Sequence, residues 1–128
     1  MRALRTLKRI FPPREFWNGK ILLLETSEEK PGMHEVDHVL RNYGMQGVYD
    51  KIKGLIFARA RDYFDDEKIK LEEKLVSVVA NEFGRPDLPI VANVDFGHTD
   101  PQLVFPLGVK AEIDCQDKKI RLIELWLS

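Results

Sequence analysis

Two side chains in this sequence have the types and the positions that acid–base chemistry requires. Glu25 directly follows the apolar run K-I-L-L-L at residues 20–24, and His98 is the fourth residue after the apolar run Ile90–Val94. A free imidazole has a pKa of about 6.5, so a histidine at such a position could act as a general base near neutral pH. A carboxylate beside it could hold the ring in one orientation.

A simpler interpretation of both positions stays open on the residues alone. His98 could be a surface or structural residue of a loop, because a lone histidine without a defined partner carries no chemistry. Glu25, with Glu28 and Glu29, could form only a solvated and negatively charged entry to the next helix.

The elements that would position these residues alternate between strand and helix. Continuous apolar runs at residues 20–24, 54–58 and 90–94 predict strands buried on both faces, as in a parallel sheet. Between them, an apolar stripe from Met33 to Tyr43 predicts a helix that stops at Gly44, and a second stripe predicts a helix from Asp65 or Asp66, acting as the cap, to Phe83. This order predicts an α/β fold.

The strand ends explain why the two candidate side chains should be accessible. Gly97 and Pro101 prevent the third strand from continuing, so His98 should lie just beyond its carboxyl end. Glu25 should lie in the same type of position after the first strand, and open α/β sheets place their sites at that edge.

The two ends of the chain carry weaker patterns. Leu4, Leu7 and Phe11 have the spacing of a short helix that ends before Pro12. Alternating apolar residues between 109 and 122 predict a terminal β-hairpin with Cys115 near its tip, which would make the sheet mixed. We therefore expect one domain over residues 1–128, with residues 1–19 as a partial lead-in segment.

Composition narrows the classes of function. The 128 residues carry 20 basic and 21 acidic side chains, and this balance argues against nucleic acid as a partner. No apolar run has membrane-spanning length and no secretory signal is present, so we expect a cytoplasmic protein without a membrane partner. One cysteine, Cys115, excludes an internal disulfide. His34 and His38 lie four residues apart but lack a metal-binding motif, so we expect no metal and no cofactor.

Three segments resemble the C-terminal domain of the LD-carboxypeptidase and microcin C immunity family of serine peptidases. They are K-I-L-L-L-E-T-S-E-E-K-P (20–31), L-R-N-Y-G-M-Q-G-V-Y-D-K-I-K-G-L-I (40–56) and N-V-D-F-G-H-T-D-P-Q-L-V-F-P-L-G (93–108). The resemblance implies a swivelling-type α/β domain. It also implies a Ser-Glu-His triad whose glutamate ends a strand in an L-E-x motif, matching Glu25, and whose histidine lies in G-H-x-x-P, matching His98.

The triad's serine belongs to a separate N-terminal domain in this family, and no segment here resembles it. Ser27 is only two residues from Glu25, Ser77 falls within an amphipathic helix, and Cys115 has no basic neighbour in the sequence, so none of them replaces that serine. The resemblance therefore implies a C-terminal half that is inactive alone. Its expected partners are the missing N-terminal nucleophile domain and, through exposed apolar surface, further copies of itself as a homodimer or homo-oligomer.

Two functions from different classes follow. The first is the C-terminal half of a serine carboxypeptidase, which would act on L,D-peptide bonds in murein peptides or on amide bonds in microcin C-type peptidyl-nucleotides. The second is a non-catalytic interaction module that keeps the Glu25 and His98 pair as a relic.

Overall fold

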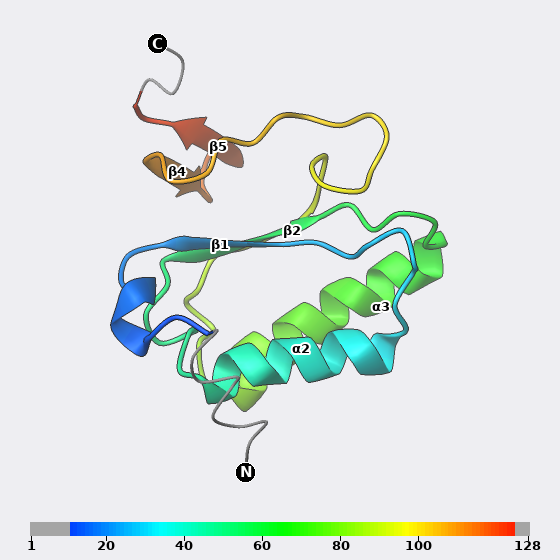
Figure 1. The fold of residues 1–128 in the computed structure, drawn as a ribbon, viewed down its shortest axis with the longest axis horizontal. Helices are drawn as coiled ribbons and strands as arrows, with labels where there is room; N and C mark the ends of the chain where they lie inside the picture. Colours follow the sequence, from blue (N-terminus) through cyan, green and yellow to red (C-terminus); the bar gives the residue numbers. More distant parts are fainter. Residues whose placement is uncertain (1–10, 125–128) are drawn as a thin grey trace.

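The computed structural model describes residues 11–124, which form two layers of secondary structure and a separate hairpin. A three-stranded sheet lies in the middle, helices cover one of its faces, and the hairpin lies over the other (Figure 1). The helix expected over residues 4–11 falls almost wholly outside the described residues. None of the described helices is long and apolar enough to cross a membrane.

All three predicted strands are present and run parallel. They are β1 (Ile21–Leu24), β2 (Gly54–Ala58) and β3 (Ile90–Val94), in the order β1-β2-β3 with β2 in the centre. The α/β class is confirmed. The predicted antiparallel pairing also exists, but it forms its own two-stranded sheet instead of extending the parallel one.

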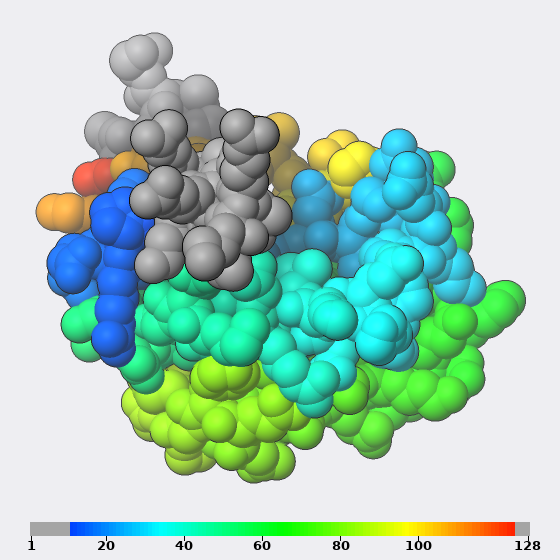
Figure 2. Space-filling view, turned by 60° about the horizontal axis from the view of Figure 1, so that its bottom comes forward, coloured from blue at the N-terminus to red at the C-terminus, as the bar shows by residue number. Residues whose placement is uncertain are grey.

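The helices that connect the strands lie on the same face of the sheet. The connections β1 to β2 and β2 to β3 run in the same direction across the sheet, and connections between parallel strands have the same, right-handed sense. The first is α2 (Met33–Met45), and the second is α3 (Asp65–Val76), which continues as the π-helix η2 (Ser77–Glu82). Figure 2 shows α2 in cyan beside the green α3 and η2. Gly44, the predicted stop, lies within the last turn of α2. There a Cβ would come 2.3 Å from the Phe83 ring, so glycine permits close packing of α2 against the end of η2.

The prediction that Asp65 or Asp66 caps α3 was wrong. Phe64 is the N-cap residue, and Asp65 and Asp66 already belong to the first turn. The Phe64 amide donates to Oε2 of Glu67 at 2.7 Å, so a side chain inside the helix satisfies the free backbone group. This hydrogen bond, with a second one from Lys30, lowers the pKa of Glu67.

The sheet separates two apolar clusters by the alternation of side chains along each strand. The cluster on the helix side is the larger core and contains fully buried residues of α2, β2, α3 and η2. The second cluster lies under the hairpin and the loop after β3. Strand residues of the helix side are Leu22, Leu24, Leu55, Phe57, Ile90 and Ala92; those of the second face are Ile21, Leu23, Ile56, Ala58, Val91 and Val94.

A β-bulge near the end of β3 changes this alternation. Ile56 pairs with Val91, but Ala58 pairs with Val94, so β3 has one extra residue in the interval. Asn93 takes up the extra length with a φ of +62°, a conformation that asparagine tolerates better than most residues. The bulge returns Val94 to the second face and sets the direction in which the chain leaves the sheet.

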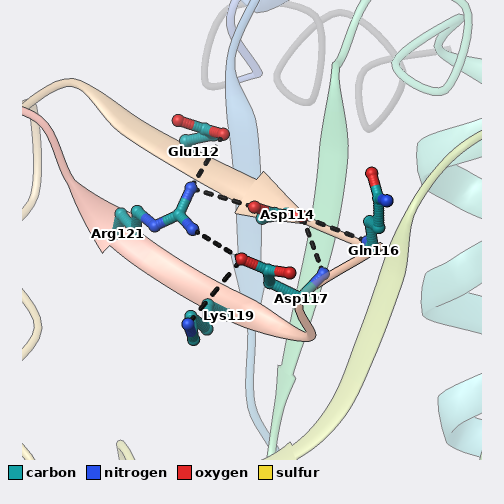
Figure 3. Close-up of polar contacts among 6 residues, drawn as sticks. All are labelled: Glu112, Asp114, Gln116, Asp117, Lys119 and Arg121. Atoms are coloured by element: carbon teal, nitrogen blue, oxygen red, sulfur yellow. Dashed lines mark hydrogen bonds and ion pairs between the residues drawn. The ribbon is translucent and has the colours of Figure 1, made fainter.

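The hairpin consists of β4 (Ala111–Asp114) and β5 (Lys119–Leu122), as the alternation predicted. Ile113 and Ile120 face the second cluster, while charged side chains point away from it. The Arg121 guanidinium spans the outer surface and contacts Glu112, Asp114 and Asp117 (Figure 3). These contacts hold the two strands of the hairpin together at the side away from the sheet.

Candidate active site

The structure brings the two predicted side chains into direct contact. Glu25 is the first residue after β1 and His98 is the fourth after β3, and Nδ1 of His98 lies 3.0 Å from Oε2 of Glu25. The same carboxylate oxygen accepts a hydrogen bond from the backbone amide of His98 at 2.8 Å. Glu25 therefore fixes both the loop and the ring, and the ring nitrogen that it contacts is held as the proton-bearing one.

The two residues come from strands that are not neighbours. β2 lies between β1 and β3, so the strand ends are about 9–10 Å apart, twice the usual spacing of about 4.8 Å. The loop after β3 covers part of this gap, and the glutamate side chain reaches across the rest. An aspartate, shorter by one methylene, would not reach as far.

Gly97 makes the contact sterically possible. Its φ is +74°, in the left-handed region, and a Cβ at this position would lie 1.8 Å from Oε2 of Glu25. Any side chain here would therefore displace the carboxylate that holds His98.

The loop that carries His98 is fixed by contacts that the sequence did not reveal. Arg59 follows β2, and its Nε donates to Oδ1 of Asp95 at 2.6 Å while Nη2 donates to the Pro101 carbonyl at 3.2 Å. The Leu103 amide closes the loop onto the Asp95 carbonyl at 2.7 Å. Phe96 is buried and packs against Ile56 and Ala58 in the second cluster. An arginine directly after a buried strand was the available signal for this clamp.

Glu28 is also part of the site, although the sequence analysis considered it only as part of a solvated entry to the next helix. Its Oε2 lies 2.9 Å from Nε2 of His98, so the imidazole is bracketed by two carboxylates. The side chain of Glu28 is 60% exposed, against 40% for Glu25, and it has no contact with the loop backbone comparable to the His98 amide bond of Glu25. Glu25 is accordingly the better-held partner of the ring.

None of the other candidates has a described hydrogen bond or ion pair with Glu25 or His98. Ser27 uses its hydroxyl to accept the Glu29 amide at 3.4 Å, and Ser77 begins η2. Cys115 is exposed in the turn of the hairpin. His34 and His38 stack edge to face on α2 with ring centroids 5.0 Å apart, and no metal-binding group of three or more ligand side chains occurs among residues 11–124.

The fold and the site define an α/β domain that presents a carboxylate–imidazole pair at the carboxyl edge of a parallel sheet. The sequence profile of the family described as the LD-carboxypeptidase C-terminal domain matches residues 3–113. The chain therefore belongs to this family.

Relatives and solved structures agree with this assignment. The chain is 30% identical over 116 residues to the microcin C7 self-immunity protein MccF of Escherichia coli, covering 89% of this chain and 32% of that protein. It is 29% identical over 111 residues to a putative carboxypeptidase of Vibrio cholerae, covering 85% and 31%. The chain thus spans about a third of the length of these relatives.

Two solved structures have the same fold. An MccF-like protein from Streptococcus pneumoniae in complex with AMP superimposes with a TM-score of 0.71 at 30% identity, covering 94% of this chain and 33% of that one. MccF in complex with glutamyl sulfamoyl guanosine superimposes with a TM-score of 0.76 at 29% identity, covering 98% and 37%.

Replacing Gly97 should separate the Glu25 and His98 side chains. In Gly97→Ala the new methyl group would displace the carboxylate, so the His98 amide should lose its hydrogen bond, exchange faster with solvent and shift in an NMR spectrum. Gly108→Ala is the matched control, because Gly108 also has a positive φ, +77°, but has nothing within 4 Å of its Cβ position. Both variants should lose about 1–2 kcal/mol of stability from the strained backbone. An unchanged His98 amide in Gly97→Ala would contradict this geometry.

Proposed function

We propose that this domain supplies the glutamate and the histidine of a Ser-Glu-His triad in a serine carboxypeptidase. The observation that carries the proposal is the 3.0 Å contact between Nδ1 of His98 and Oε2 of Glu25, in a chain of the LD-carboxypeptidase C-terminal domain family. The carboxylate holds the imidazole so that Nε2 is the nitrogen left for chemistry.

In this mechanism Nε2 of His98 accepts the proton of a serine hydroxyl as the oxygen attacks the substrate carbonyl. The imidazolium then gives that proton to the leaving amine, and Glu25 stabilises the positive ring between the two transfers. Ser27 and Ser77 do not contact the ring, whose two nitrogens face Glu25 and Glu28. Following the resemblance to the family, we assign the serine to the part of a family-length protein that this chain does not align with.

The proposed substrates belong to the two classes that the resemblance to the family implies. One is an L,D-peptide bond to a terminal D-alanine in a murein peptide, and the other is an amide bond in a peptidyl-nucleotide of the microcin C type. Similarity to MccF and to MccF-like structures with nucleotide-type ligands supports the second class. Similarity to a putative carboxypeptidase at nearly the same identity supports the first. We place the reaction in the cytoplasm.

The direct test joins this chain to the nucleophile-bearing part of a family member and measures hydrolysis of both substrates. The chain alone should hydrolyse neither substrate. In the joined protein, His98→Ala should lower kcat on the order of 10⁴-fold while changing KM much less, since the base acts in the transition state. Glu25→Gln should also lower kcat, because an amide N–H facing Nδ1 favours the wrong tautomer.

His34→Ala is the control for this test, because His34 is exposed on α2 and has no described hydrogen bond or ion pair with Glu25 or His98. Normal turnover in His98→Ala, with an unchanged melting curve, would overturn the triad and favour the interaction module that keeps a relic pair.

The hairpin covers the second face of the sheet only in part, and the remaining apolar surface supports a partner there. Between the hairpin and β3 lies an open apolar cavity of about 890 Å³, and Leu103 and Val104 at its rim are 60% and 79% exposed. Nearby Leu107 is 78% exposed. An apolar surface of this kind marks an interface. We propose that the rest of a family-length protein covers it and that the chain alone covers it with a second copy.

Light scattering on the isolated chain tests this surface. The unchanged chain should associate at high concentration, and replacing Val104 and Leu107 with serine should leave a monomer by removing apolar contact area. Serine at Val39 and Ile69, which are also exposed but lie on the helices, should leave the association unchanged. A monomeric unchanged chain would contradict the proposal.

A further inference from the structure

The second ring nitrogen of His98 is already occupied in this domain. Nε2 lies 2.9 Å from Oε2 of Glu28, a hydrogen-bond distance. In the triad proposed above, this is the nitrogen that must face the serine hydroxyl. Glu28 therefore takes the position of the nucleophile at the imidazole.

A fixed turn places Glu28 there. The Ser27 carbonyl accepts the Lys30 amide at 3.3 Å, which closes a turn over residues 27–30. The Lys30 ammonium pairs with Oε2 of Glu67 at 3.0 Å, and the Tyr63 hydroxyl donates to the Pro31 carbonyl. Contacts at the start of α3 thus hold the backbone of the turn, while the Glu28 side chain itself is 60% exposed and has room to rotate into solvent.

Proton positions make this contact incompatible with base catalysis. Nδ1 of His98 holds its proton toward Glu25, and the Nε2 contact with Glu28 needs another proton between the two atoms, because otherwise two lone pairs would face each other at 2.9 Å. With that proton in place, the lone pair of Nε2 is not available to accept hydrogen from a serine. Before the ring can act as a base, the extra proton must pass to solvent and the Glu28 carboxylate must move away.

We propose that Glu28 is an autoinhibitory stand-in for the nucleophile, which holds His98 inactive until the serine takes its place. This inference rests on the proposed function. The two carboxylates then have different roles at one ring: Glu25 is held by two hydrogen bonds and stays, whereas Glu28 is held by one contact and leaves. When the serine docks, its hydroxyl replaces the Glu28 carboxylate at Nε2.

The availability of the Nε2 lone pair can be measured directly in the isolated chain. Diethyl pyrocarbonate acylates a neutral imidazole nitrogen, and peptide mass spectrometry gives the rate for each histidine separately. In the unchanged chain His98 should react more slowly than His34 and His38, which are exposed on α2. In Glu28→Ala the His98 rate should rise about two- to fivefold, the range expected for the loss of one exposed ion pair.

Two further variants separate the effect of the Glu28 contact from effects of charge and of turn structure. Glu29→Ala removes the same charge one residue away and has no side-chain contact with His98 among the described hydrogen bonds and ion pairs, so its His98 rate should stay unchanged. Glu28→Gln keeps the shape and removes the charge, so it should raise the rate while disturbing the turn less. The rates of His34 and His38 serve as internal references in every sample.

The outcomes separate this inference from the proposed function. Equal His98 rates in Glu28→Ala, Glu28→Gln and Glu29→Ala, or a His98 in the unchanged chain as reactive as His34, would overturn the role of Glu28. The acylation measurement needs neither serine nor substrate, so its result does not depend on whether His98 is essential for hydrolysis. A loss of activity in His98→Ala with no effect of Glu28 on acylation would leave the triad in place without the stand-in.

Discussion

The site depends on a bridge across the central strand of the sheet. Glu25 and His98 follow the two outer strands, β1 and β3, and β2 separates them. Three features close the distance: the length of the glutamate side chain, the loop that leads from β3 toward β1, and a glycine at 97 that leaves space for the carboxylate. The single oxygen Oε2 of Glu25 then binds both the backbone and the ring of His98, so the position of the loop and the orientation of the imidazole are set together.

Other parts of the fold hold the loop after β3 in the position that the Glu25–His98 contact needs. The bulge at Asn93 directs the chain out of β3, and Phe96 anchors the loop in the apolar cluster on the second face. The Arg59 side chain ties the loop to the end of β2 through Asp95. Because β2 supplies that clamp, all three strands contribute to the position of one histidine. The helices on the opposite face bury the core that keeps the strands in register.

The strands and the two candidate residues could be predicted from the sequence, because apolar runs of strand length and a glycine or charged residue at their ends are local signals. Residues 54–58 and 90–94 matched the observed strands, and Glu25 and His98 lay where the run ends indicated. The bulge at Asn93 and the pairing of Arg59 with Asp95 could not be predicted, since both depend on which strands are neighbours and in which register. The contact of Glu28 with His98 was missed for the same reason: Glu28 and Glu29 look alike in sequence, and only the turn over 27–30 places Glu28 at the ring.

The central claim is that this domain alone assembles the carboxylate–imidazole pair, and NMR of the histidine ring nitrogens tests it most directly. In the isolated ¹⁵N-labelled chain, a proton on Nδ1 of His98 should be observed with slowed solvent exchange, because it donates to Glu25 at 3.0 Å. The signal should disappear in Glu25→Ala and remain in Glu28→Ala. A His98 ring whose Nδ1 proton exchanges freely, or whose spectrum is the same in Glu25→Ala, would show that the pair is not formed in this domain.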